Sequence, residues 1–101
     1  MRDVHEVVSH TADAAGLHAP AVTLLLELQQ QLGELSKLAV TGTQRGRGPL
    51  RPDANWAATL GELGFGVYLL ADQTGVDLAA AVTQAAGRLG ASTARDADLP
   101  F

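Results

Sequence analysis

The polar side chains that could carry chemistry lie within two leucine-rich stretches. Glu27, Gln31 and Glu34 are spaced at i, i+4 and i+7, so on a helix they form one polar stripe beside the leucine face. In the second stretch, Glu62 stands between two leucines. Carboxylates in such positions either are solvated surface groups or contact a ligand.

Glycines accompany these polar residues. Gly33 lies in the first stretch, and Gly61, Gly64 and Gly66 surround Glu62 in the second. Each glycine costs roughly 1 kcal/mol relative to alanine in a helix interior. We therefore expect these glycines to mark places where a neighbouring backbone or a ligand comes close.

Histidines and aromatic residues offer weaker candidates. His5, His10 and His18 have no HExxH context, so structural or solvated histidines are favoured over a zinc site. Trp56 and Tyr68 could stack on a base, although Trp56 falls on an apolar stripe, where a core position is favoured.

Basic residues concentrate in one glycine- and proline-rich segment. Arg45, Arg47 and Arg51 lie between residues 41 and 52, and Lys37 precedes them. These four side chains could contact the phosphates of a nucleotide. The alternative is that arginines in such a loop are merely solvated.

Two helices are predicted in the first half of the chain. The first runs from an N-cap at Asp3 to Ala15 and ends at Gly16. The second begins at Pro20, a favourable first helical position, and continues to about Val40. Its apolar stripe is spaced 3, 4, 3, 4 and consists of Leu25, Leu28, Leu32, Leu35 and Ala39.

Two further helices are predicted after the basic segment. The third begins near Asp53 or Asn55, runs to about Thr74 and has a stripe of Trp56, Leu60, Leu63, Val67 and Leu70. Gly75 is a predicted C-cap, Asp77 is a predicted N-cap, and Asp72 is expected to be a helix-end residue. The fourth helix continues through Leu78, Val82, Ala85 or Ala86, and Leu89.

These elements predict an all-α fold, an antiparallel helical bundle formed by a single domain over residues 1–90, with 91–101 as a flexible C-terminal tail. Only two helices carry a full apolar stripe, and the remainder is rich in alanine. A core of this kind is marginal in so small a domain. We therefore expect a homodimer that completes the core.

Composition excludes several classes of protein. The chain has 101 residues, no cysteine and a net charge of −4, so disulfide frameworks, thiolate metal sites and nonspecific nucleic-acid binding are not expected. The N-terminus lacks an apolar segment typical of a signal peptide, and no apolar run is long enough to cross a bilayer. We expect a cytoplasmic protein without a membrane or nucleic-acid partner.

Four short motifs occur in a characteristic order. The chain reads HAP at 18–20, QQLGEL at 30–35, ELGF at 62–65 and GVDL at 75–78. This order and spacing resemble the MazG-like branch of the all-α nucleoside triphosphate pyrophosphohydrolases. In that family a helix written roughly EExGEL is followed by a helix written ELGD and by a G-[IV]-D-L turn. The resemblance covers about Leu17 to Leu89.

The resemblance implies a metal-dependent reaction. Acidic residues of the two family motifs bind Mg²⁺, which bridges the triphosphate and helps a water to attack, so that pyrophosphate and a nucleoside monophosphate are released. The first motif falls on Gln31 and Glu34, with Gln30 beside them, and the second falls on Glu62 and Phe65. Two of the four motif carboxylates are thus replaced, by Gln31 and Phe65.

The resemblance therefore implies a depleted Mg²⁺ site formed by Glu34 and Glu62, with Glu27 and Gln31 as further candidate ligands. Mg²⁺ should bind weakly, and pyrophosphate hydrolysis of a nucleoside triphosphate should be weak, altered or lost. The alternative is a non-catalytic helical dimer that acts as a nucleotide-binding or protein-interaction module. The sequence leaves open whether the protein is an enzyme.

Overall fold

The computed structural model describes the backbone of residues 3–97 and the side chains of residues 3–91. Its elements are α1 (Val4–Ala15), α2 (Ala21–Gly42), α3 (Ala54–Gln73) and α4 (Leu78–Ala97). No strand occurs over residues 3–97, so the all-α prediction is confirmed. None of the helices in this range has the length and hydropathy that a membrane span requires.

The helix ends follow the local sequence closely. Asp3, Asp53 and Asp77 each accept a hydrogen bond from the backbone N–H three residues further on, at 2.8, 2.9 and 3.1 Å. Gly16 and Gly75 adopt left-handed φ angles of 66° and 73° after α1 and α3, a conformation that favours glycine. The predicted ends at Asp3, Gly16 and Asp77 are confirmed, and α3 begins after Asp53, one of its two expected starts. The C-cap of α3 is Thr74, and the predicted Gly75 is the residue after it.

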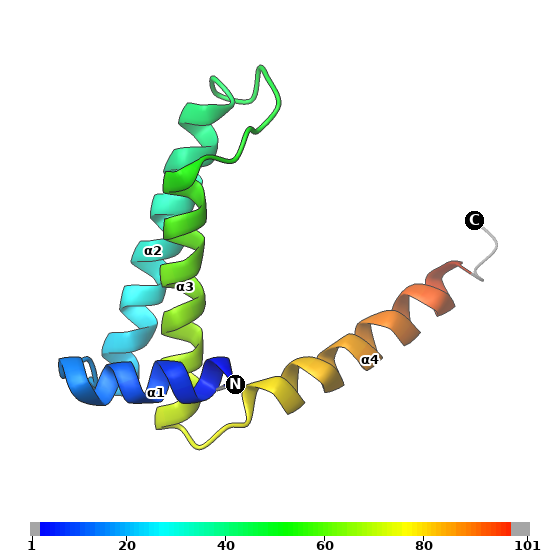
Figure 1. Ribbon diagram of the computed structural model, residues 1–101. Helices are drawn as coiled ribbons and strands as arrows, with labels where there is room; N and C mark the ends of the chain where they lie inside the picture. Colours follow the sequence, from blue (N-terminus) through cyan, green and yellow to red (C-terminus); the bar gives the residue numbers. More distant parts are fainter. Residues whose placement is uncertain (1–2, 98–101) are drawn as a thin grey trace.

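Three of the helices pack together (Figure 1). α2 and α3 lie side by side and antiparallel, and α1 crosses them at the end away from the α2–α3 loop. The core lies where the three helices meet, and its buried residues are Val8, Ala12, Leu24 and Leu69. Phe65 and Tyr68 are partly buried against it.

The buried faces of α2 and α3 agree with the predicted stripes only in part: Leu35 is buried as predicted, but other stripe residues are not. Leu25, Leu32 and Leu60 belong to those stripes but are 48%, 56% and 49% exposed. Leu24 and Leu69, outside the stripes, are only 2% and 3% exposed. α2 carries three consecutive leucines at residues 24–26, so apolar residues occupy more than one face and their spacing alone does not select the buried one.

α4 extends away from the other three helices (Figure 1), so the predicted four-helix bundle is present only in part. The Cα radius of gyration is 17.1 Å, compared with about 13 Å for a compact domain of this length. α4 also continues past Leu89 to Ala97. The single Gly90 does not end the helix, because the sequence after it is rich in alanine, a strong helix former.

Candidate functional site

A cavity of about 360 Å³ lies between α2 and α3, next to the turn that joins α1 to α2. We call it the α2–α3 cavity. It brings together four residues singled out from the sequence: Glu27 and Gln31 on α2, and Glu62 and Phe65 on α3. The remaining lining residues are Gly16, Leu17, His18, Ala19, Leu24, Leu28, Gly66 and Leu69.

Gly66 on α3 lies close to two side chains of α2 in this cavity. A Cβ placed on Gly66 would lie 2.7 Å from Leu28 Cδ2 and 3.3 Å from Gln31 Oε1. That amide oxygen is buried and has no hydrogen-bond partner among the described protein atoms. Gly66 therefore meets the expectation that a glycine marks a close approach.

No close approach within the described chain is found at the other three glycines. A Cβ placed on Gly33, Gly61 or Gly64 would have no heavy atom within 4 Å, apart from the helix's own nearby backbone. Their small size is not required by any packing contact in the described part of the chain.

Other predicted site residues lie elsewhere. Glu34 is exposed and does not line the α2–α3 cavity. Lys37 is also exposed, further along α2. Arg45, Arg47 and Arg51 lie in the loop after Gly42, at the far end of the helix pair (Figure 1), beyond about 16 Å of helix measured from Gln31. The structure does not bring these basic residues to the cavity.

The ligand types at the α2–α3 cavity do not match a complete Mg²⁺ site. The Glu27 and Glu62 carboxylates and the Gln31 amide are hard oxygen donors of the kind that Mg²⁺ takes. Phe65 supplies no oxygen and packs against the core instead. Over the described residues, no three His, Cys, Asp or Glu side chains gather where they could hold a metal ion.

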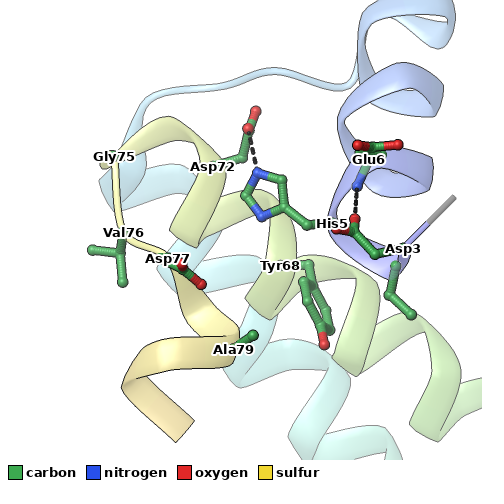
Figure 2. Close-up of a pocket in the computed structure, with 10 residues that line it drawn as sticks. Asp3, His5, Glu6, Tyr68, Asp72, Gly75, Val76, Asp77 and Ala79 are labelled. Atoms are coloured by element: carbon green, nitrogen blue, oxygen red, sulfur yellow. Dashed lines mark hydrogen bonds and ion pairs between the residues drawn. The ribbon is translucent and has the colours of Figure 1, made fainter. Parts of the chain in front are cut away.

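A larger hollow lies where the start of α1, the end of α3 and the start of α4 meet. We call it the acidic pocket; its volume is about 640 Å³, and Figure 2 shows its lining. It is lined by four acidic residues together with aromatic, apolar and histidine side chains, namely Asp3, Val4, His5, Glu6, Tyr68, Asp72, Gly75, Val76, Asp77 and Ala79.

Most carboxylates of the acidic pocket already hold the fold together. Asp3 and Asp77 cap α1 and α4. Asp72 Oδ1 lies 3.0 Å from His5 Nε2, and Asp72 Oδ2 accepts a 3.4 Å hydrogen bond from Ser9. These contacts join α1 to α3. The sequence gives no signal of the His5–Asp72 pair, because the residues are 67 positions apart.

His18 joins three segments beside the α2–α3 cavity. Its Nε2 lies 2.6 Å from Asp13 Oδ1, and its Nδ1 lies 3.1 Å from Gln73 Oε1. The hydrogen bond to Asp13 raises the pKa of His18 above its ordinary value of 6.5, and the hydrogen bond to Gln73 adds to this rise. His18 is thus a structural histidine, one of the two roles expected from the sequence.

No protein-family model, curated protein or solved structure matches the chain. The structure establishes an all-α protein with four helices over its described residues. The evidence for function is therefore the geometry of the two hollows and the motif resemblance in the sequence.

Proposed function

We propose that the protein is a MazG-like homologue of the nucleoside triphosphate pyrophosphohydrolases whose metal site is reduced and whose hydrolysis is weak. One observation carries this proposal. Gln31, from the first motif, and Glu62 and Phe65, from the second, line one cavity between two antiparallel helices. Two facing helices that present such residues to one space are the arrangement that the motif resemblance implies.

The charge of the cavity accounts for weak activity. Glu27 and Glu62 can at most neutralise one Mg²⁺ ion, which leaves no excess attraction for competition with water. Each lost carboxylate removes an attraction of about 4 kcal/mol per pair of unit charges at 4 Å and a surface-like dielectric, before hydration offsets part of it. We therefore propose that Mg²⁺ binds the free protein weakly and enters chiefly with the nucleotide.

The two remaining carboxylates also restrict the form in which a nucleotide can bind. A bare triphosphate is repelled by Glu27 and Glu62, whereas its Mg²⁺ complex carries less negative charge and offers them a cation. Glu27, one turn before Gln31, would then serve as a substitute ligand. Glu34 is less suited to this role because it lies outside the cavity.

Pyrophosphate release tests this proposal. It should be measured with Mg²⁺ across a panel of ordinary and modified nucleoside triphosphates. We expect slow release that depends on Mg²⁺, is abolished by Glu62→Gln and persists in Glu34→Gln, an exposed residue outside the cavity. Release that survives Glu62→Gln and Glu27→Gln would place the reaction elsewhere, and no release from any nucleotide would leave the second candidate.

The second candidate is a non-catalytic helical dimer that binds nucleotides or a protein partner. The exposed apolar side chains favour it, because Val22, Leu26 and Val82 are 69%, 60% and 57% exposed. Exposed apolar residues that gather into one patch commonly mark an interaction site, and Val22 and Leu26 lie one helical turn apart on α2. Calorimetry that detects binding of a nucleoside triphosphate without turnover would support this candidate over the first.

A further inference from the structure

The turn between α1 and α2 is fastened to the end of α3 by Gln73. The Ala19 backbone N–H donates to Gln73 Oε1 at 3.1 Å, and the Gln73 side-chain N–H donates to the Ala19 carbonyl. This pair of hydrogen bonds fixes which end of the amide is oxygen. Gln73 therefore presents an acceptor to His18 Nδ1, which lies 3.1 Å from Oε1.

The other ring nitrogen of His18 also faces an acceptor. Its Nε2 lies 2.6 Å from the Asp13 carboxylate, which at neutral pH only accepts hydrogen bonds. A short separation of this kind is typical of a charge-assisted hydrogen bond. A neutral imidazole has a single N–H and can donate to only one of the two partners. Both contacts together require that both ring nitrogens carry a proton.

We infer that His18 is an imidazolium that works as a pH-sensitive latch, joining α1 through Asp13 and α3 through Gln73. When His18 loses a proton, one of these two hydrogen bonds is lost. The turn that it holds supplies Gly16, Leu17 and Ala19 to the wall of the α2–α3 cavity. Deprotonation therefore loosens the mouth of that cavity, whatever ligand the cavity takes.

The groups around His18 favour the charged ring from two elements. Asp13 on α1 is its hydrogen-bond partner, and Asp72 on α3 adds a further attraction. Glu27 and Glu62 lie on the same cavity as His18. Because the pKa of His18 is raised above 6.5, the stabilisation is fully present below that ordinary value and is lost as pH rises through the raised pKa.

Nitrogen NMR of the full chain tests the latch without any substitution. We expect the His18 ring to show two protonated nitrogens at about pH 6, and to lose one proton at a pH above the ordinary histidine value. The Ala19 amide, which donates to Gln73, should lose hydrogen-exchange protection over the same pH interval. A His18 ring with a single protonated nitrogen at about pH 6 would overturn the inference.

Two variants separate the latch from a general effect of pH. Asp13→Asn should lower the pH at which His18 titrates and at which Ala19 loses protection. His18→Gln should remove the pH dependence of Ala19 protection, whereas His10→Gln, on the exposed side of α1, should retain it. If protection changes identically with pH in His18→Gln and in the unaltered protein, the turn is not held by the charge on His18.

Discussion

Gly66 is the position in α3 where the absence of a Cβ allows the side chains of α2 to lie close. A Cβ there would meet the end of Leu28 at 2.7 Å and the buried Gln31 oxygen at 3.3 Å. Turning the Leu28 methyl group away would relieve the shorter contact, but the tight contact with the Gln31 oxygen would remain. Of the four glycines that the sequence suggested, only Gly66 marks a close approach within the described chain.

Alanine substitutions distinguish this glycine from its neighbour. Gly64→Ala should raise the free energy of unfolding by up to about 1 kcal/mol, because alanine favours the helix and the site has open space. Gly66→Ala should be at least about 1 kcal/mol less stable than Gly64→Ala, because it overpacks the contact with Leu28. Urea unfolding measures both, and equal stabilities would mean that the close approach costs nothing.

Gln31 and Phe65 are the two neutral residues of the α2–α3 cavity that stand where the MazG-like motifs have carboxylates. Introducing both carboxylates of the proposed MazG-like motifs by Gln31→Glu and Phe65→Asp should raise Mg²⁺ affinity more than either change alone, because both would act on one ion. The expected interaction energy in a double-mutant cycle is about 0.5–3 kcal/mol. Phe65→Asp also removes a side chain packed against the core, so the double variant should be less stable until Mg²⁺ is added.

A matched control for this cycle replaces Gln30, which is exposed and does not line the cavity. Gln30→Glu combined with Phe65→Asp adds the same charge and should show no coupling in Mg²⁺ binding. If the Gln31→Glu and Phe65→Asp pair gains neither metal affinity nor metal-dependent thermal stability, the motif alignment is wrong.

At the scale of elements, the helix ends were predictable because they are local. Asp53 caps α3 through a backbone N–H three residues away, and this preference is visible in a few residues of sequence. The buried face of α2 was not predictable in the same way. Its three consecutive leucines leave several possible apolar faces, and the crossing of α1 selects the face that contains Leu24.

The candidate site was likewise predictable only where the spacing of nearby residues carries the information. Gln31, Glu62 and Phe65 could be placed in one site because the motif spacing carries information about two facing helices. Glu34 belongs to the same motifs but lies outside the cavity, whereas Glu27, expected only as a further candidate ligand, lines it. The contacts of His18 with Gln73 and of His5 with Asp72 span 55 and 67 positions. They join helix ends that meet only when α1 crosses the α2–α3 pair, and no helical period encodes that crossing.

Caps on packed and unpacked helices should differ in their effect on stability. Asp53→Ala should lower the free energy of unfolding by about 0.5–2 kcal/mol, because α3 packs against α1 and α2. Asp77→Ala removes the equivalent cap of α4, but α4 extends away from the core, so it should lower helix content with little change in the unfolding midpoint. Trp56 fluorescence in α3 and circular dichroism measure the two effects.

Equal shifts of the unfolding midpoint in the two cap variants would show that α4 folds together with the other helices. Such a result would point to packing of α4 within an assembly, since within one chain α4 stands apart (Figure 1). Most of the stability of helices in proteins comes from tertiary packing, so α4 should also exchange its amide protons faster than α2 and α3 when the protein is dilute.

At the scale of the whole molecule, the chain exposes apolar side chains that a single copy does not bury. Leu25, Leu32 and Val22 lie on one side of α2, which we call its outer face, and are 48%, 56% and 69% exposed. Over the described residues, only six hydrophobic residues are buried, including the four of the core. This is little for a domain of this length. A second copy that covers the outer face of α2 would add apolar burial without any further chain.

The protein should therefore form a dimer that dissociates when the outer face of α2 becomes charged. Sedimentation equilibrium at low micromolar concentration should give twice the mass of the chain. Leu25→Lys combined with Leu32→Lys should weaken association by at least about tenfold, because each lysine would have to leave water at the contact. Gln30→Lys, on the polar side of the same helix, should leave association unchanged. Both leucines are already half exposed in one chain, so the variants should still fold, which circular dichroism can verify.

A folded monomer in the unaltered protein would contradict the prediction. A dimer that tolerates both lysines would place the contact on another surface, with α4 as the next apolar face to test.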